Sequence, residues 1–293
     1  VIALVLWWQP QAILGGYAYR DFTLSERVLT QGRLLWQYLA WLTVPDISSM
    51  GFHHDDILLS QSWMRPFTTA VAAVAWVLVL VVAIMQRNRA PLFLFAVLAY
   101  LVGHVLESSI WPLEMVYEHR NYLPSVGVLV FFGAALCGLV ARFETIRPRM
   151  VVAVALAVFS TCLFLRVQVW AEPVRLATVN LENHPDSSRT QYYVAKTQLD
   201  AYVTEQSLGA AADLQKMQAH LLRARHHLEL MYLNNRQSLA AIVLLYVLDS
   251  AYFPTLAEQN NWLERVAAIV EQRPLQPSDI NGLDSLVDCY TRG

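Results

Sequence analysis

The stretch FTTAVAAVAWVLVLVVAIM, residues 67–85, decides which class of fold this sequence can adopt. It contains no charged side chain, and its length matches the roughly 20 apolar residues that a helix needs to cross a bilayer. Three further apolar stretches predict spans over residues 91–106, 122–140 and 150–170. A shorter run over residues 1–14 is interpreted as the end of a helix, so we expect the sequence to be the C-terminal part of a longer membrane protein. The fold class predicted is all-α, with a polytopic bundle of transmembrane helices.

The composition supports a membrane protein. Of the 293 residues, 56% are hydrophobic and only 15% are charged, whereas a soluble domain has about 25% charged residues. The net charge of −2 excludes a nucleic-acid-binding protein that works through a basic field. The three cysteines, Cys137, Cys162 and Cys289, lie too far apart to predict a disulfide framework or a zinc site.

Arginines in two short loops predict how the chain is oriented in the membrane. These are Arg87 and Arg89 in the first loop, and Arg142, Arg147 and Arg149 in the second. Basic residues in short loops favour the cytoplasmic side. Alternation of the spans then places residues 15–66, residues 107–121 and the chain after Trp170 on the opposite side.

From residue 171 onward the sequence is typical of a soluble helical domain. Apolar residues recur at helical spacing, and helices are predicted over residues 190–202, 210–232, 238–248 and 256–272. Their period fits two degenerate units of the tetratricopeptide (TPR) kind, while a non-repetitive helical bundle fits equally well. In either case Ala195 and Ala224 are expected where paired helices approach closely. This domain, residues 171–293, is expected to bind the acceptor or a protein partner.

The loop over residues 107–121 is unusually rich in ionisable side chains, namely Glu107, Glu114, Glu118, His119 and Arg120. Such groups are costly at membrane depth, so they mark a functional site. A guanidinium presents a planar fork that suits phosphate. The alternative is interfacial anchoring, because an aromatic belt accompanies the charges: Trp111, Tyr117 and Tyr122.

An aromatic, amphipathic segment over residues 33–45 predicts a helix lying in the interface plane, although a helix packed on the bundle would show the same pattern. Arg27, Arg33 and Trp36 are expected to line a path for a lipid substrate, with both arginines close to lipid head groups. Downstream, a polar stretch is expected to form a polar mouth together with Glu107 and Glu114: His53, His54, Asp55 and Asp56. Neighbouring side chains point to different faces, so this stretch disfavours a metal site, although a divalent metal stays an open alternative.

Two segments of the chain resemble a known family. One covers residues 26–39, and the other contains the element Glu118-x-Arg120-x-Tyr122-Leu-Pro-Ser. Over residues 20–130 the sequence resembles the membrane half of bacterial, tetratricopeptide-bearing glycosyltransferases of the GT-C fold, and is similar to the TMTC O-mannosyltransferases.

The resemblance implies a hexosyl- or pentosyltransferase of the bacterial inner membrane with a periplasmic C-terminal domain. It would transfer a sugar from a polyprenyl-phosphate donor to a protein or glycan. The residues implied to bind the donor phosphate are Arg120, Glu118, His119 and Tyr122, with Glu118 orienting Arg120. The family's general base belongs to a loop that would precede Val1. Two other functions stay open, an O-antigen-ligase or polymerase type of transferase and a non-catalytic membrane-anchored scaffold for envelope assembly.

Overall fold

The computed structural model describes residues 11, 14–44, 51, 53–143, 147–272, 275, 279–280, 283–284 and 287. Within that part of the chain every regular element is a helix, which confirms the all-α prediction. The expected helix over residues 1–14 lies almost wholly outside the described residues. The chain forms two compact units. The N-terminal unit comprises residues 1–50 and 57–168, and the C-terminal unit comprises residues 51–56 and 169–293.

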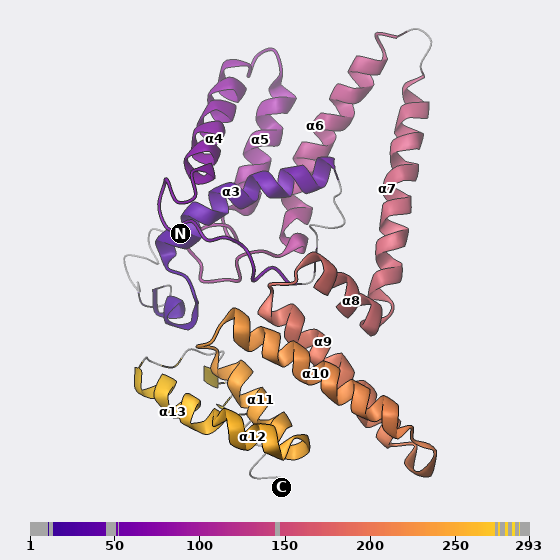
Figure 1. Cartoon of the computed structure of the whole chain (residues 1–293). Coiled ribbons are helices and arrows are strands. Elements are labelled where there is room, and N and C mark those ends of the chain that lie inside the picture. Colours follow the sequence, from indigo (N-terminus) through magenta and orange to yellow (C-terminus); the bar gives the residue numbers. More distant parts are fainter. Residues whose placement is uncertain are drawn as a thin grey trace. The chain divides into compact units, whose positions relative to one another are not determined.

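The N-terminal unit contains the apolar helices (Figure 1). Its elements are η1 (Gly15–Tyr19), α3 (Leu24–Thr43), α4 (Thr68–Met85), α5 (Pro91–His104), η2 (Glu118–Asn121), α6 (Tyr122–Val140) and α7 (Pro148–Trp170). Among the described residues, three helical stretches are long and apolar enough to cross a membrane: Thr68–Met85, Glu118–Val140 and Pro148–Trp170. The second predicted span, over residues 91–106, forms the shorter helix α5 and then turns.

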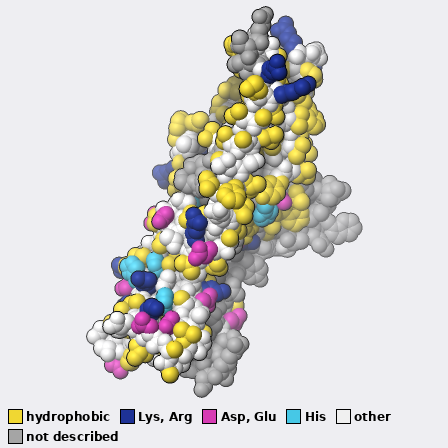
Figure 2. Space-filling view, turned by 90° about the vertical axis from the view of Figure 1, so that its right-hand side faces the viewer, with side chains coloured by type: hydrophobic (Ala, Val, Ile, Leu, Met, Phe, Trp, Pro, Cys, Tyr) yellow, Lys and Arg dark blue, Asp and Glu magenta, His cyan; other side chains and the backbone are white. Residues whose placement is uncertain are grey.

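The surfaces of these helices are suited to lipid. Only 11% of the apolar window of α4 and none of that of α7 is buried inside the protein. Figure 2 shows hydrophobic side chains over much of the visible surface of the N-terminal unit, with Lys and Arg side chains gathered at one end. Apolar surface on this scale is stable in hydrocarbon and unstable in water.

Helix α3 differs from the spans because only one of its faces is apolar. It begins with a capping box, in which Thr23 accepts a hydrogen bond from the backbone N–H of Glu26 and the Glu26 carboxylate accepts one from the backbone N–H of Thr23. Its buried face includes Leu34, Tyr38 and Trp41, which recur at helical spacing and form a core with residues of α5 and α6. In Figure 1 α3 runs across α4, α5 and α6 rather than along them.

The described helices of the C-terminal unit are α8 (Pro173–Asn183), α9 (Ser188–Gln206), η3 (Gly209–Ala211), α10 (Leu214–Asn234), α11 (Leu239–Tyr252), α12 (Pro254–Asn260) and α13 (Trp262–Gln272). Helices α9 and α10 pack together along much of their length. Ala195 and Ala224 are almost fully buried in the core of this unit, where a larger side chain would hold the helices apart. The unit is therefore helical as predicted, whereas its assignment to the TPR class stays a prediction.

A buried carboxylate joins three helices of this unit. Asp249 of α11 is fully buried and accepts hydrogen bonds from Arg225 of α10 (Nε, 2.8 Å) and Trp262 of α13 (Nε1, 2.9 Å). A buried charge is stable only when it is paired and hydrogen-bonded, so these contacts fix the positions of α10 and α13 on α11.

Candidate functional site

The loop that follows α5 is held in place by one buried arginine of α3. The Arg27 side chain is fully buried. Its Nη2 donates to the carbonyl oxygen of Glu107 (2.6 Å), its Nε to that of Ser109 (3.1 Å), and its Nη1 to that of Leu113 (2.5 Å). Among the described residues, no backbone N–H donates to these three carbonyls. A guanidinium can replace such donors because it supplies several of them in one plane.

Arg27 therefore corrects one prediction. The sequence places it beside lipid head groups, but the structure buries it under the loop because the loop's carbonyls need donors. Burial lowers the pKa of Arg27 to about 10, mainly because the charged form is desolvated. The side chain is thus still cationic at neutral pH and organises the loop.

The segment before α3 fastens the same loop from its other side. Arg20 donates from Nε to the carbonyl oxygen of Pro112 (2.8 Å) and from Nη1 to the carboxylate of Glu114 (2.6 Å). The Tyr17 hydroxyl donates to the carbonyl oxygen of Ile110 (2.7 Å). Gly16 allows this close approach, since a Cβ there would lie 2.5 Å from the Pro112 ring. Sequence reasoning missed Arg20, whose position gives no local signal of a partner so distant in sequence.

Arg120 lies at the centre of the loop's charged groups. Its side chain is 8% exposed, and its Nε forms an ion pair with Glu107 Oε2 at 3.2 Å. Nη1 donates to the carbonyl oxygen of Glu114 (2.6 Å), and the guanidinium carbon lies 4.8 Å from the centre of the Tyr117 ring. Within the described part of the chain, Nη2 has no hydrogen-bond partner. The guanidinium is thus fixed in position with donors to spare.

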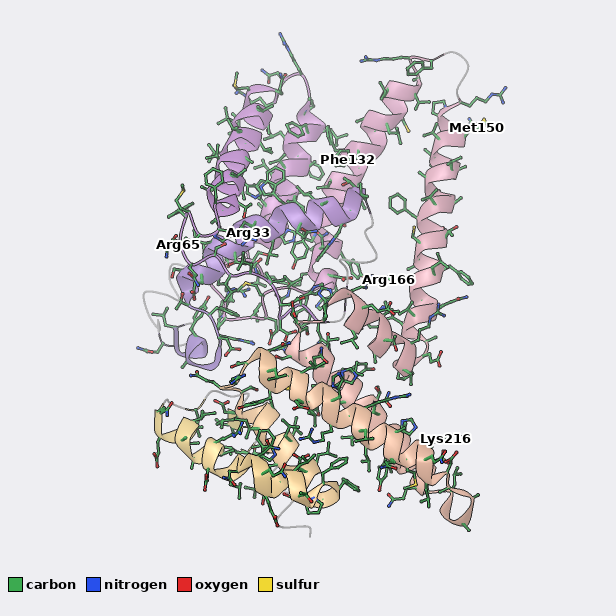
Figure 3. All side chains as sticks on the ribbon, in the orientation of Figure 1. Arg33, Arg65, Phe132, Met150, Arg166 and Lys216 are labelled. Atoms are coloured by element: carbon green, nitrogen blue, oxygen red, sulfur yellow. The ribbon has the colours of Figure 1, made fainter. Side chains whose placement is uncertain are left out.

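The acid that pairs with Arg120 is not the one predicted. Glu118 forms an ion pair with Arg166 of α7 (2.7 Å), whereas Arg120 pairs with Glu107. Figure 3 shows Arg166 near the end of α7. A signal for this contact was available, because Arg166 is a lone charge in a long apolar helix and such charges usually have a partner.

Two other residues implied to bind phosphate lie at the edge of this group. The His119 ring stacks on Tyr117, with the ring centres 5.2 Å apart. The Tyr122 side chain is largely exposed at the start of α6. His119 and Arg120 thus both contact the Tyr117 ring, whereas the Tyr122 side chain points outward.

Below the loop, several buried polar atoms lack hydrogen-bond partners among the described residues. They include Nε2 of His104 and Oδ1 of Asn121. His104 contacts the carbonyl oxygen of Tyr100 through Nδ1 (3.0 Å), so Nδ1 carries the proton and Nε2 is an acceptor. Tyr38 connects the group, since its ring stacks on His104 and its carbonyl oxygen accepts from Asn121. Unpaired buried acceptors are rare and suit the hydroxyl groups of water or of a bound molecule.

The stretch over residues 53–56 belongs to the C-terminal unit. Asp56 contacts His184 at the end of α8 (Oδ2 to Nδ1, 2.8 Å). Asp55 accepts hydrogen bonds from the Ser187 hydroxyl and from the backbone N–H of Arg189 (3.1 Å), and so acts as an additional cap of α9.

The two histidines of this stretch lie beside aromatic rings of the same unit. His54 lies edge-on to His184, with ring centres 5.1 Å apart, and His53 lies near Tyr193. A Cβ at Gly51 would lie 2.8 Å from the His184 ring, so the chain passes very close to α8. The partners described above belong to α8, to α9 and to the turn between them, all in the C-terminal unit. The expected grouping of residues 53–56 with Glu107 and Glu114 of the N-terminal unit stays a prediction. Among the described residues no group of three His, Cys, Asp or Glu side chains could hold a metal ion.

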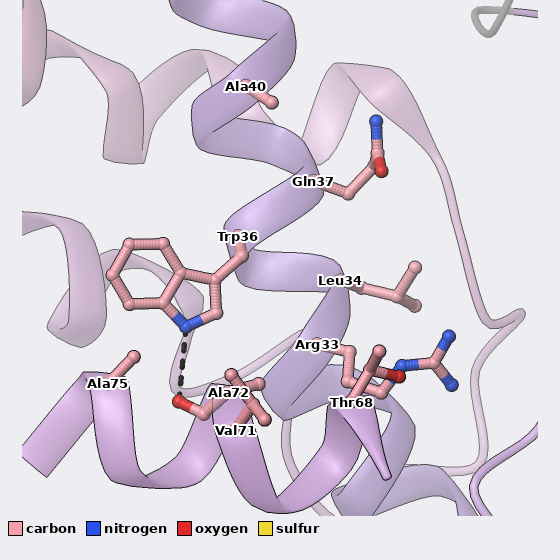
Figure 4. A pocket seen from close by; sticks show the side chains of 9 residues that line it. All are labelled: Arg33, Leu34, Trp36, Gln37, Ala40, Thr68, Val71, Ala72 and Ala75. Carbon is pink, nitrogen blue, oxygen red and sulfur yellow. Dashed lines mark hydrogen bonds between the residues drawn. The ribbon is translucent and has the colours of Figure 1, made fainter. Parts of the chain in front are cut away.

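A groove of about 410 Å³ lies between α3 and α4 (Figure 4). Nine residues line it: Arg33, Leu34, Trp36, Gln37, Ala40, Thr68, Val71, Ala72 and Ala75. The Trp36 indole donates to the carbonyl oxygen of Ala72 (3.2 Å) and packs on Trp76 with ring centres 4.4 Å apart. The groove contains Arg33 and Trp36, two of the three residues that the sequence assigns to a lipid path.

Comparison of the chain with protein-family models, curated proteins and solved structures gives no match.

Proposed function

We propose that the chain acts in a membrane glycosyltransferase, which transfers a sugar from a polyprenyl-phosphate donor to a protein or glycan. The observation that carries this proposal is the state of Arg120. Its guanidinium is largely buried at the end of an apolar helix, is held by Glu107 and the Glu114 carbonyl, and retains donors on Nη2. A guanidinium fixed in this way is suited to the phosphate of a lipid-linked substrate.

The proposed reaction is a displacement at the anomeric carbon of the donor sugar. The oxygen of an acceptor hydroxyl forms a bond to that carbon, and the bond between the carbon and the phosphate oxygen breaks. The electron pair leaves with the lipid phosphate, and the acceptor's proton passes to a base. Arg120 stabilises the negative charge that develops on the leaving phosphate. A single preorganised donor of this kind contributes about 3–4 kcal/mol to transition-state stabilisation.

The unpaired acceptors below the loop support a sugar as the group beside the phosphate. His104 Nε2 and Asn121 Oδ1 can each accept a hydrogen bond from a hydroxyl. A metal cation would satisfy the same acceptors, but the nearby guanidinium of Arg120 disfavours a second positive charge. A neutral polyhydroxylated group such as a sugar donates hydrogen bonds to these acceptors and adds no positive charge beside Arg120.

The contacts of residues 55 and 56 support the proposed number of membrane crossings. Asp55 and Asp56 bond to Ser187 and His184, so both segments lie on one side of a membrane. An even number of crossings must therefore separate them along the chain. Three helices between them are of span length, which favours a crossing by α5 as well. At about 21 Å, α5 is shorter than the hydrocarbon core of about 30 Å, and local thinning of the bilayer accommodates such a mismatch.

In this proposal the C-terminal unit lies on the extracytoplasmic side, where it binds the acceptor or a protein partner. The basic loops at residues 86–90 and 142–149 then lie in the cytoplasm of a bacterial cell, and the protein resides in the inner membrane.

The test replaces Arg120 with lysine and with alanine in the protein expressed in its native membranes. Transfer is measured from glycan masses on envelope proteins and from accumulation of the lipid-linked sugar. We expect Arg120→Ala to lower transfer about 100-fold or more. Arg120→Lys keeps the positive charge but loses the planar fork of donors, so its transfer rate should fall between those of the wild type and of Arg120→Ala.

Arg20→Ala is the matched control, because it also removes an arginine that holds this loop but leaves Arg120 in place. Retention of each variant in the membrane and its thermal stability show whether it folds. Normal glycans in a folded Arg120→Ala variant would refute the proposal. A phenotype that instead follows changes in the C-terminal unit alone would favour a non-catalytic scaffold.

A further inference from the structure

We propose that the groove between α3 and α4 binds an anionic phospholipid of the bilayer. The lipid phosphate lies at Arg33, and part of one acyl chain lies against α4. This site is separate from the loop around Arg120 and does not depend on the transfer reaction proposed above.

The shape and lining of the groove fit a molecule with one charged end. Its volume of about 410 Å³ lies within the range of small-molecule sites, roughly 300–1,000 Å³. The polar lining comes from Arg33, Gln37 and Thr68, while α4 contributes Val71 and Ala72 to the apolar wall. In Figure 4 Arg33 and Trp36 lie toward opposite ends of the groove. A lipid phosphate at the Arg33 end and a hydrocarbon chain at the Trp36 end would match these two kinds of lining.

Arg33 is positioned for an anion but is not neutralised by one. Its Nη1 donates to the carbonyl oxygen of Leu58 (2.9 Å) and to the Ser60 hydroxyl (3.2 Å). These contacts hold the guanidinium in place, and within the described residues neither Nε nor Nη2 has a partner. Neither contact supplies a negative charge. The half-buried cation therefore favours an anionic ligand, which would form charge-assisted hydrogen bonds to the remaining donors.

The surroundings of the groove favour a lipid that comes from the bilayer. Helix α4 is of span length, and only 11% of its apolar window is buried inside the protein. Just before it, Trp63, Met64 and Phe67 are each about 60% exposed, which is typical of side chains at the membrane interface. A molecule in the groove is thus reached laterally from lipid. Bulk phospholipid is far more abundant than a lipid-linked sugar, so mass action also favours it at this site.

Fluorescence of Trp36 provides a direct test, because this indole lines the groove. The protein is placed in nanodiscs that contain increasing fractions of brominated phosphatidylglycerol or brominated phosphatidylcholine. Bromine quenches tryptophan emission on contact. Subtracting the signal of the Trp36→Phe variant isolates the emission of Trp36 from that of the other tryptophans.

We expect brominated phosphatidylglycerol to quench Trp36 at a lower mole fraction than brominated phosphatidylcholine. Arg33→Gln should raise the mole fraction needed for half quenching about tenfold, which is the loss expected for one charge-assisted contact. Arg33→Lys retains a cation and should keep most of the preference. Arg65→Gln, which removes an exposed arginine of the same unit (Figure 3), should leave quenching unchanged.

Three outcomes would overturn the proposal. Equal quenching by the two lipids would show that the groove does not select an anion. Equal effects of Arg33→Gln and Arg65→Gln would show that any preference comes from the general charge of the surface. Displacement of the brominated lipid by a small fraction of polyprenyl phosphate would assign the groove to the donor lipid. Circular dichroism of each variant checks that the overall helix content is retained.

Discussion

Replacement of Arg27 by methionine should loosen the loop after α5 without unfolding the apolar helices. Methionine keeps a long apolar stem but removes every hydrogen-bond donor. Three carbonyl oxygens then lose their donor, those of Glu107, Ser109 and Leu113. The Glu114 carbonyl, which Arg27 also contacts, keeps its bond to Arg120.

The size of the effect follows from these three carbonyls. Each buried carbonyl left unpaired costs about 1–3 kcal/mol, and some of this is recovered because the guanidinium is no longer desolvated. We therefore expect the free energy of opening the loop to fall by about 3–5 kcal/mol, a large part of the roughly 5–15 kcal/mol that stabilises a typical domain.

Hydrogen exchange measured by mass spectrometry on residues 107–117 provides the assay. A decrease of this size should speed exchange about 100-fold to 4,000-fold in the loop, since each 1.4 kcal/mol corresponds to a factor of about ten. Exchange within α4 should change little. Arg65→Met serves as the control, because that arginine is exposed. If the loop exchanges at nearly the same rate in both variants, Arg27 does not organise it and the reasoning fails.

Three further predictions concern the C-terminal unit. Asp55→Ala should destabilise the start of α9 by about 1 kcal/mol, because the Ser187 hydroxyl and the Arg189 amide lose their acceptor; unchanged exchange of the first-turn amides of α9 would contradict this. Burial lowers the pKa of His227 below its ordinary value of 6.5. The unfolded chain therefore binds this proton more readily, and stability should be lost as pH falls from about 6.5 through the lower pKa of the folded state. Denaturant unfolding between pH 7.5 and pH 5 should show that slope, and His227→Gln should reduce it; an equal slope in the variant would refute the assignment. Ala224→Leu should lower the stability of this unit by about 1–3 kcal/mol, because this fully buried position between α9 and α10 has no room for a larger side chain; an unchanged melting temperature would show that the helices can separate.

The apolar helices could be predicted because length and absence of charge are local properties of a sequence. Helices α4, α6 and α7 lie close to their expected ranges for this reason. The end of α5 was less predictable, since Val105 and Leu106 are apolar and would continue a helix on local grounds. The chain turns there instead, and the loop that follows is fixed by contacts with α3.

The partners of the charged groups depend on contacts between distant parts of the chain. Arg27 and the Glu107 carbonyl are separated by 80 residues, and Arg166 and Glu118 by 48. A local pattern identified the loop as charged, but it could not indicate which acid would pair with Arg120. Asp56 and Asp55 illustrate the same limit, because their partners His184 and Ser187 lie 128 and 132 positions away in the sequence.

The contact between Asp55 and Ser187 has a consequence for the order in which the protein matures. The two residues are separated by 132 positions in the chain. At a synthesis rate of about 5–20 residues per second, Asp55 leaves the ribosome roughly 7–26 s before its partner exists. During that interval the apolar helices between them are made. The C-terminal unit can therefore complete its fold only after both Asp55 and the much later start of α9 have been synthesised. Delayed insertion of the intervening helices would leave α9 without the cap that Asp55 provides.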